Sequence, residues 1–247
     1  DSVAYARERV QGRIPGRGEV RIIEHGDVRR MLLTMRALTI ATRAVVLESA
    51  AALDVHAHGA DEGSRRKYGL YADLLTPVAK GWCTEVAQEA ASLSVQVFGG
   101  MGFVEETGVA QHMRDARILP IYEGTNGIQA LDLAGRKLLK QGDATLRGVI
   151  QQIRELSAGL PQGNVLEATR LLAGADLLDS TTSWLLEHAA DDPNTVSATA
   201  FNFLMLTGTV LGDHGSNPSG RPGNAVRVRC VQGLDRLGIS MLGEGRE

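Results

Sequence analysis

One acidic side chain stands where a carboxylate could do chemistry. Glu123 lies in the segment IYEGTN, residues 121–126. Gly124 would let another group approach the backbone closely, and Thr125 could cap a following helix or bind a ligand through its hydroxyl. A carboxylate in such a place could act as a general base. The pattern also fits an acidic residue that the helix dipole favours near a helix N-terminus, so the local sequence leaves both interpretations open.

A glycine-rich turn is the second candidate. Residues 96–103 read QVFGGMGF, and the three glycines could bring backbone amides close to a cofactor. They could equally end a helix and form a tight turn, which is the better interpretation when the segment is taken alone. No strand is expected before them, so they are not a dinucleotide-binding fingerprint. The six histidines form neither an HxxxH nor an HExxH pattern, and no metal site is expected.

Composition favours a helical fold that would carry these candidates. The chain has 247 residues, of which 43% are hydrophobic but only 4% aromatic, and this suits helix packing better than a strand-rich sandwich. A net charge of -3 with mixed signs offers no extended positive surface for nucleic acid. Cys83 and Cys230 suggest neither a disulfide framework nor a metal site, and a reducing cytoplasm fits best. Neither a signal peptide nor a membrane-spanning run is expected.

Helical periodicity predicts how the first half is built. A helix from residue 1 should stop at a loop over residues 12–18, and a long helix should run from about Asp27 to about Gly59. The charged stretch 61–67 is expected to be a solvated connection. Thr76-Pro77 is typical of a helix start.

The next elements would carry both candidate sites. The helix that begins at Thr76-Pro77 should end at Gly99-Gly100, and a short helix should include residues 112–116. Residues 118–122 are expected to be extended. Thr125 should then cap a helix that reaches residue 140.

Beyond residue 142 a second helical block is expected, with helices near 144–158, around 168–185 and from Asp192-Pro193 to about residue 210.

Residues 1–140 resemble acyl-CoA dehydrogenases, whose last domain is a helical bundle. Three motifs in the same order carry this resemblance, and together they are more specific than any one of them. The motifs are RERVQG at 7–12, QVFGGMGF at 96–103, and RDAR at 114–117 followed by IYEGT at 121–125.

The second block, with WLLEH at 184–188 and DDP at 191–193, resembles the C-terminal extension of an enlarged subset of that family. The resemblance implies an all-α protein with an antiparallel up-and-down helical bundle and a smaller helical extension. The expected domains are the bundle over 1–141, the extension over 142–212 and an irregular tail over 213–247, which is rich in Gly and Arg.

The resemblance also implies a reaction. Glu123 would remove the α-proton of an acyl-CoA thioester while the β-hydrogen leaves as hydride to FAD, which gives the trans-2-enoyl-CoA of fatty acid β-oxidation. Exclusion of water would suit the carboxylate to this task. Tyr122 and Gly124 would contact the substrate. Cofactor contacts are implied for Arg9, Gln11, Gln96, Gly99, Gly100 and Thr125.

Partners follow from the same resemblance. Arg9, with Gln11, would reach FAD bound in a neighbouring subunit, so a homodimer or homotetramer is expected, with an electron-transfer flavoprotein as electron acceptor. The family's N-terminal helical and middle β domains are absent from this sequence, so the fragment alone is expected to be inactive. The alternative is a non-catalytic helical assembly module derived from that family.

Overall fold

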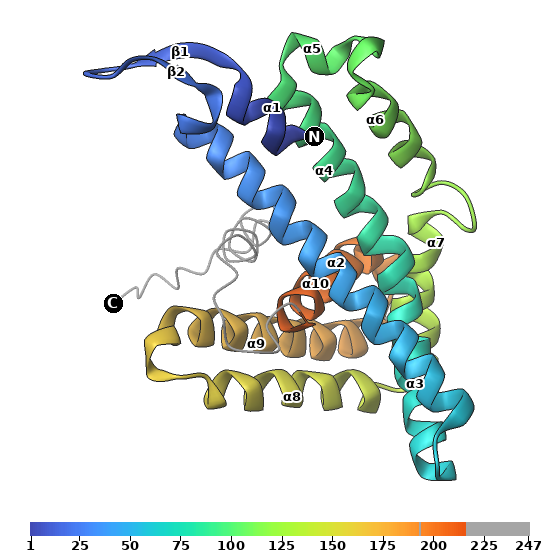
Figure 1. The fold of residues 1–247 in the computed structure, drawn as a ribbon. Helices are drawn as coiled ribbons and strands as arrows, with labels where there is room; N and C mark the ends of the chain where they lie inside the picture. Colours follow the sequence, from blue (N-terminus) through green and yellow to red (C-terminus); the bar gives the residue numbers. More distant parts are fainter. Residues whose placement is uncertain (193, 216–247) are drawn as a thin grey trace, which may run out of the picture.

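The computed structural model describes residues 1–192 and 194–215, and nearly all elements in these ranges are helices. Long helices run beside one another, and a pair of helices lies across them (Figure 1). The expected all-α class is therefore confirmed.

The first block carries most of the elements. They are α1 (Ser2–Glu8), β1 (Val10–Ile14), β2 (Gly18–Arg21), η1 (Ile22–Glu24), α2 (Gly26–His58), α3 (Glu62–Pro77), η2 (Val78–Trp82), α4 (Cys83–Phe98), α5 (Gly100–Phe103), η3 (Glu105–Thr107), α6 (Val109–Ile118), α7 (Asn126–Leu131) and η4 (Asp132–Lys140). The second block holds α8 (Ala144–Gly159), η5 (Gln162–Asn164), α9 (Val165–His188) and α10 (Asn194–Gly215).

The connection between α2 and α3 is shorter than the sequence suggested. Helix α3 begins at Glu62, so the expected solvated connection over residues 61–67 was wrong. Asp61 explains the early start, because its carboxylate accepts a hydrogen bond of 2.7 Å from the backbone N–H of Ser64 and caps the helix. The charges of this stretch therefore lie on a helix.

Thr76-Pro77 does not start a helix, contrary to expectation. Pro77 is the last residue of α3, and the chain continues through the π-helical turn η2 into α4. Proline lacks an N–H and cannot donate the helical hydrogen bond to the residue four positions earlier. The helix widens to a π-helical turn directly after it. The N–H of Cys83 donates to the carbonyl of Val78, five residues earlier. Helices α3 and α4 are thus joined through η2 into one nearly continuous helix that contains a single wide turn.

Residues 12–18 are part of a hairpin rather than a simple loop. Strands β1 and β2 pair antiparallel, with Val10 opposite Arg21 and Ile14 opposite Gly18. Gly12, Gly16 and Gly18 take φ values of 78°, 77° and 76°, which L side chains rarely adopt. These glycines allow the chain to reverse and pair with itself.

The stretch 118–122 is a tight turn, so the expected extended conformation was also wrong. The carbonyl of Ile118 accepts from the N–H of Ile121 at 2.9 Å and from the N–H of Tyr122 at 3.2 Å. This double acceptance draws the chain back at the end of α6.

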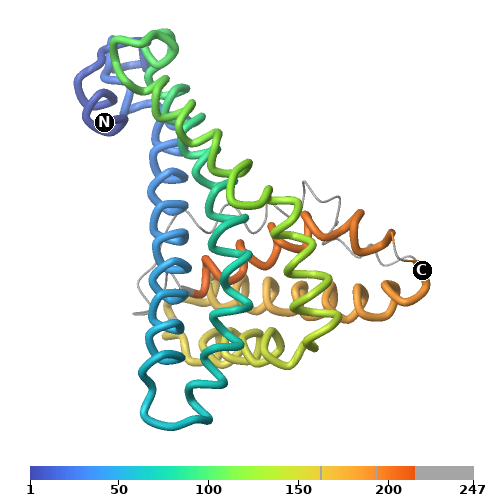
Figure 2. The backbone as a smooth tube through the Cα atoms, turned by 90° about the vertical axis from the view of Figure 1, so that its right-hand side faces the viewer, coloured from blue at the N-terminus to red at the C-terminus, as the bar shows by residue number. Residues whose placement is uncertain are grey.

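The second block packs against the first through a shared apolar core. Figures 1 and 2 show α8 and α9 side by side across the long helices, with α10 between them and α2. One cluster of buried side chains includes Leu75 and Leu133 from the first block and Ile150, Leu178 and Leu204 from the second. The expected boundary at residues 141 and 142 stays a prediction. Across it, the described residues share one core.

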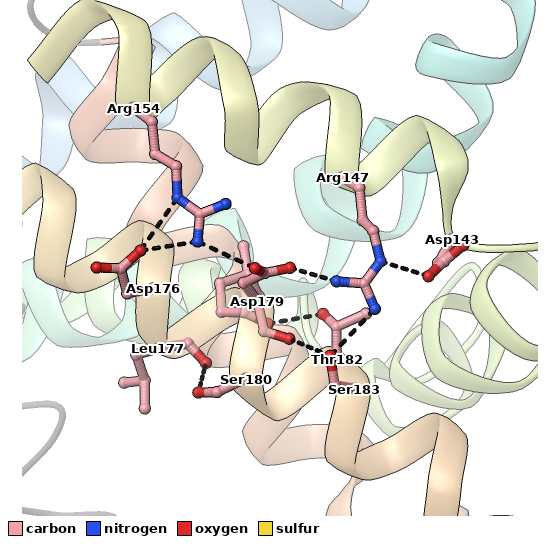
Figure 3. A network of polar contacts seen from close by, with 10 residues as sticks. Asp143, Arg147, Arg154, Asp176, Leu177, Asp179, Ser180, Thr182 and Ser183 are labelled. Atoms are coloured by element: carbon pink, nitrogen blue, oxygen red, sulfur yellow. Dashed lines mark hydrogen bonds and ion pairs between the residues drawn. The ribbon is translucent and has the colours of Figure 1, made fainter. Parts of the chain in front are cut away.

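Charged side chains add partly exposed contacts between α8 and α9 (Figure 3). Arg147 pairs with Asp143 and Asp179. Arg154 lies 2.7 Å from Asp176 and 3.0 Å from Asp179. Since these side chains remain partly exposed, the network orients the two helices more than it stabilises them.

Helix α10 is long and apolar, although no membrane-spanning run was expected from the sequence. By length and composition, residues Asn194–His214, with a mean hydropathy of 1.3, could cross a membrane. Half of that window is buried in the fold, where Leu204 and Leu211 are 0% and 1% exposed. Its apolar surface is used for packing on the bundle. The helix also includes residues 213–215, which the sequence placed in an irregular tail; residues 216–247 lie outside the described part.

Candidate active site

The segment that holds Glu123 has an unusual backbone. Glu123 adopts φ = 55° and Gly124 φ = 81°. Positive φ costs free energy for a residue with a Cβ, and such strain concentrates at functional sites. The next residue, Thr125, caps α7 as expected, since its hydroxyl accepts from the N–H of Ile128 at 3.4 Å. The Glu123 carboxylate is thus carried on a strained turn directly before a helix.

Hydrogen bonds between neighbouring residues of the chain close this turn. The N–H of Asn126 donates to the carbonyl of Pro120 at 3.0 Å. The amide of Gln129 reaches the Glu123 carbonyl at 3.5 Å. The Glu123 and Tyr122 side chains themselves are exposed in this chain. Both therefore face outward, where a substrate or another part of the protein could meet them.

Two buried or partly buried polar residues, Lys80 and Asn126, support the turn through hydrogen bonds. Neither of them was identified from the sequence. The Lys80 ammonium donates to the Gly124 carbonyl at 2.5 Å and to Asn126 Oδ1 at 3.0 Å. The Asn126 side-chain nitrogen lies 3.1 Å from the Gly81 carbonyl and 2.9 Å from Glu85 Oε1. Asn126 is only 4% exposed. A signal was present, because Lys80 is the lone charged residue between Asp73 and Glu85.

The electrostatics of Lys80 reflect its position. Burial lowers the pKa of Lys80, while the carboxylates of Glu85 and Glu123 act in the opposite direction. The neighbouring thiol of Cys83 is not a second reactive group, since burial raises its pKa to about 12. The carboxylates of Glu85 and Glu123 are therefore the acidic groups beside Lys80 at this end of α4.

The glycine turn forms a separate site at the other end of α4. Gly99 ends the helix with φ = 60° and ψ = -137°, as expected for a helix stop. Gly102 is required by packing, because a Cβ there would meet the Val95 carbonyl at 2.5 Å. At Gly100, neither a positive φ nor close packing requires a glycine, since a Cβ there would meet nothing within 4 Å. The exposed backbone at Gly100 leaves room for a group from outside the chain.

Arg9 and Gln11 lie at this same end of the molecule. Helix α1 packs on α4 through a 2.8 Å hydrogen bond between Ser2 and Ser94 and a stack of Tyr5 on Phe98 with ring centroids 4.2 Å apart. The Arg9 guanidinium lies 3.4 Å from Gln11 Oε1, and both are exposed. In Figure 1, α1 and α5 accordingly lie at the upper end of α4.

The predicted site residues therefore form two groups. The first group lies near the start of α4 and is called the Glu123 turn; it consists of Tyr122, Glu123, Gly124 and Thr125. The second group, called the glycine-turn site, consists of Arg9, Gln11, Gln96, Gly99 and Gly100. Helix α4 has 16 residues and is about 24 Å long, so the structure does not bring the two groups together.

The glycine-turn site suits an extended polar ligand. Gln96 is exposed and can both donate and accept hydrogen bonds. Arg9 presents a guanidinium suited to phosphate, and the open backbone at Gly99 and Gly100 allows close approach. This donor set fits a phosphate-bearing cofactor such as FAD. Within the described residues, no three His, Cys, Asp or Glu side chains converge on a point that could hold a metal ion.

Known proteins resemble the chain both in sequence and in fold. The family profile described as "Acyl-CoA dehydrogenase, C-terminal domain" matches residues 1–138. The 3-methylmercaptopropionyl-CoA dehydrogenase of Ruegeria pomeroyi is 47% identical over 215 residues, which cover 85% of this chain and 36% of that protein. The chain thus spans little more than a third of that relative's length.

Two solved structures share the fold at low sequence identity. Caenorhabditis elegans ACDH-11 in complex with C11-CoA superposes with a TM-score of 0.71 at 19% identity, over 98% of this chain and 40% of that one. An acyl-CoA dehydrogenase complexed with FAD from Bacillus anthracis gives a TM-score of 0.58 at 20% identity, over 96% of this chain and 43% of that one.

Proposed function

The chain belongs to the acyl-CoA dehydrogenase family, and from this premise we propose that the full-length protein oxidises an acyl-CoA to the trans-2-enoyl-CoA. The substrate loses one proton from the α-carbon and one hydride from the β-carbon. FAD supplies the hydride acceptor when it is bound. The two hydrogens thus leave as one proton, which the base accepts, and one hydride, which carries the electron pair of the broken C–H bond.

Glu123 is the proposed base. Its carboxylate is presented on a strained, supported turn, and this is the single observation that carries the proposal. A strained backbone at an exposed acidic residue is better explained by a role in the reaction than by packing. Tyr122 and Gly124 flank the carboxylate in the chain and would border the thioester, which limits water around the base. Thr125 would border both substrate and cofactor.

The separation of the two groups of residues supports a homodimer or homotetramer. A chain that offers a base at one end of α4 and a cofactor-binding surface at the other could serve two FAD molecules, one of them bound by a neighbouring subunit. Sedimentation of the full-length protein should then give a dimer or tetramer that retains FAD. Electrons would pass on to an electron-transfer flavoprotein, and an Etf-complex subunit, CarC of Acetobacterium woodii, is among the relatives at 28% identity.

Substitution of Glu123 tests the proposal. In full-length protein that purifies with FAD, Glu123→Gln should keep the flavin colour but lower the rate of flavin reduction by acyl-CoA about a thousandfold, because an amide cannot accept the proton. The exposed Glu106 on η3 offers a matched control, and Glu106→Gln should reduce at the wild-type rate. Undiminished reduction in Glu123→Gln would remove Glu123 from the role. A colourless protein that still assembles would favour a non-catalytic module.

The substrate panel should begin with a short sulfur-containing thioester. The Ruegeria pomeroyi relative carries 3-methylmercaptopropionyl-CoA in its name, and straight-chain and branched acyl-CoAs complete the panel. Flavin bleaching under anaerobic conditions reports which thioester is oxidised.

A further inference from the structure

The Glu123 turn has an external support besides the 3.0 Å hydrogen bond from the Asn126 N–H to the Pro120 carbonyl that closes it. Two successive residues with positive φ lie in the short α6–α7 connection, directly before the cap of α7. The Gln129 amide reaches the Glu123 carbonyl only at 3.5 Å. The shortest contact on the turn comes from Lys80, whose ammonium lies 2.5 Å from the Gly124 carbonyl.

The Lys80 contact fixes the peptide plane next to Glu123. A charged donor makes a hydrogen bond roughly twice as strong as a neutral one. By holding the Gly124 carbonyl and Asn126 Oδ1 together, Lys80 couples the turn to the first residue of α7. Its bonds go to these oxygens and not to the Glu123 carboxylate, so Lys80 can set where that carboxylate lies without touching the substrate.

The wide turn η2 determines where Lys80 lies, and α10 packs directly on it. A Cβ on Gly208 would come within 2.1 Å of Trp82 Cγ, and one on Gly212 within 2.5 Å of the same ring. On the neighbouring residue, a Cβ on Gly81 would meet Leu204 at 2.6 Å. Trp82 is 3% exposed and Leu204 is fully buried. The contact between η2 and α10 is therefore close enough that any added atom must move one of them.

We infer that Lys80 is the positioning residue for the Glu123 base, and that α10 holds Lys80 in place through its contact with Trp82. This inference rests on the proposed function of Glu123. It makes the second helical block a support of the reaction centre. Leu204 lies against Gly81 and Gly208 lies against Trp82. Both contacted residues directly follow Lys80 in η2, and Lys80 bonds the Gly124 carbonyl.

Lysine variants of the full-length protein test the first link. Lys80→Met keeps the length of the side chain but removes the charge, and should slow flavin reduction by acyl-CoA about 10- to 100-fold, since small misplacements of a catalytic group have effects of this size. The dissociation constant of the enoyl-CoA product should change less than about threefold, because Lys80 does not touch it. Lys80→Arg should recover part of the lost rate. Lys140→Met, at an exposed lysine, is the matched control.

Two further readouts separate positioning from general loss of structure. With an α-deuterated thioester, the isotope effect on flavin reduction should rise in Lys80→Met, because a misplaced base makes α-proton removal slower than the other steps. Amide hydrogen exchange of peptides covering residues 119–129 should become about tenfold faster in Lys80→Met and stay unchanged in α8 and α9.

A glycine pair tests the second link. Gly208→Ala should reproduce the faster exchange at 119–129, whereas Gly148→Ala in α8, where a Cβ would meet nothing within 4 Å, should not. Wild-type reduction and exchange in Lys80→Met would overturn the inference. If no thioester reduces the wild-type flavin, the proposed function fails, and hydrogen exchange then decides alone whether Lys80 holds the turn.

Discussion

Two wide helical turns, η2 and η4, each carry a lysine toward the interior, and the two lysines find different partners. Lys137 in η4 is 3% exposed at its side chain and pairs with the carboxylate of Asp73 on α3. Lys80 in η2 instead bonds a backbone carbonyl and an amide oxygen. Loss of the Asp73 carboxylate would leave the buried charge of Lys137 without its nearest partner, so this pair bears on the stability of the fold. Lys80 bonds neutral oxygens of a strained turn and fixes the position of that turn. Similar local geometry thus serves stability in one place and placement in the other.

Asp73→Asn should have the largest effect on stability. It leaves the Lys137 ammonium buried without its nearest counter-charge, which costs about 3 kcal/mol; this is the low end for such a change because Asp132 remains 3.8 Å away. The loss should appear in urea unfolding followed by circular dichroism. Asp54→Asn, at an exposed site on α2, is the control. Equal stability of the two variants would break the comparison.

The same carboxyl gives a pH dependence with a definite sign. Burial alone would raise the pKa of Asp73, but the hydrogen bond and charge of Lys137, with Arg136, lower it below 3.8 overall. The unfolded chain therefore binds more protons in acid, so the stability from this carboxyl is present above pH 3.8 and is lost as pH falls through the folded-state value. Asp73→Asn should remove that part of the acid dependence.

Glu123→Asn should have a smaller effect and the opposite sign. Asparagine accepts positive φ more readily than glutamate, so the variant should gain about 0.5–1 kcal/mol of stability while it loses flavin reduction. Urea unfolding and flavin bleaching of the same preparation check both halves. If Glu123→Asn were less stable than wild type, the turn would not be strained, and the contrast between η2 and η4 would lose its basis.

Arg147→Met should show the smallest effect. The Arg147 side chain is 37% exposed, so removal of its ion pairs should cost less than about 1 kcal/mol, and the difference should shrink in high salt. Thermal unfolding at two salt concentrations measures this, with the exposed Arg36→Met as control. A larger, salt-independent loss would show that the α8–α9 network stabilises the fold as the buried pair does.

Local sequence patterns were sufficient for the elements whose causes are local. The repeat of Met31, Leu38 and Val45 on one face predicts α2, and Thr125 predicts the start of α7. Thr76-Pro77 misled because a proline can also be absorbed by a widened turn when packing on both sides continues the helix. The hairpin was missed because its glycines read equally as a loop.

The candidate site was only half predictable. Glu123 and the glycine turn are recognisable from motifs, but the support from Lys80 joins residues 44 positions apart. Such a pairing depends on how η2, α7 and α10 pack. The one sequence signal of this pairing was the single charge of Lys80 in an apolar stretch. The spacing of residues could not show that its partner is the Gly124 carbonyl.

Proton exchange at the substrate α-carbon tests the central claim most directly. With the flavin of the full-length protein already reduced, hydride transfer is blocked, and acyl-CoA in heavy water reports only the base. Wild-type protein should introduce deuterium at the α-carbon, and Glu123→Gln should do so about a thousandfold more slowly. Exchange at the wild-type rate in Glu123→Gln would contradict the account.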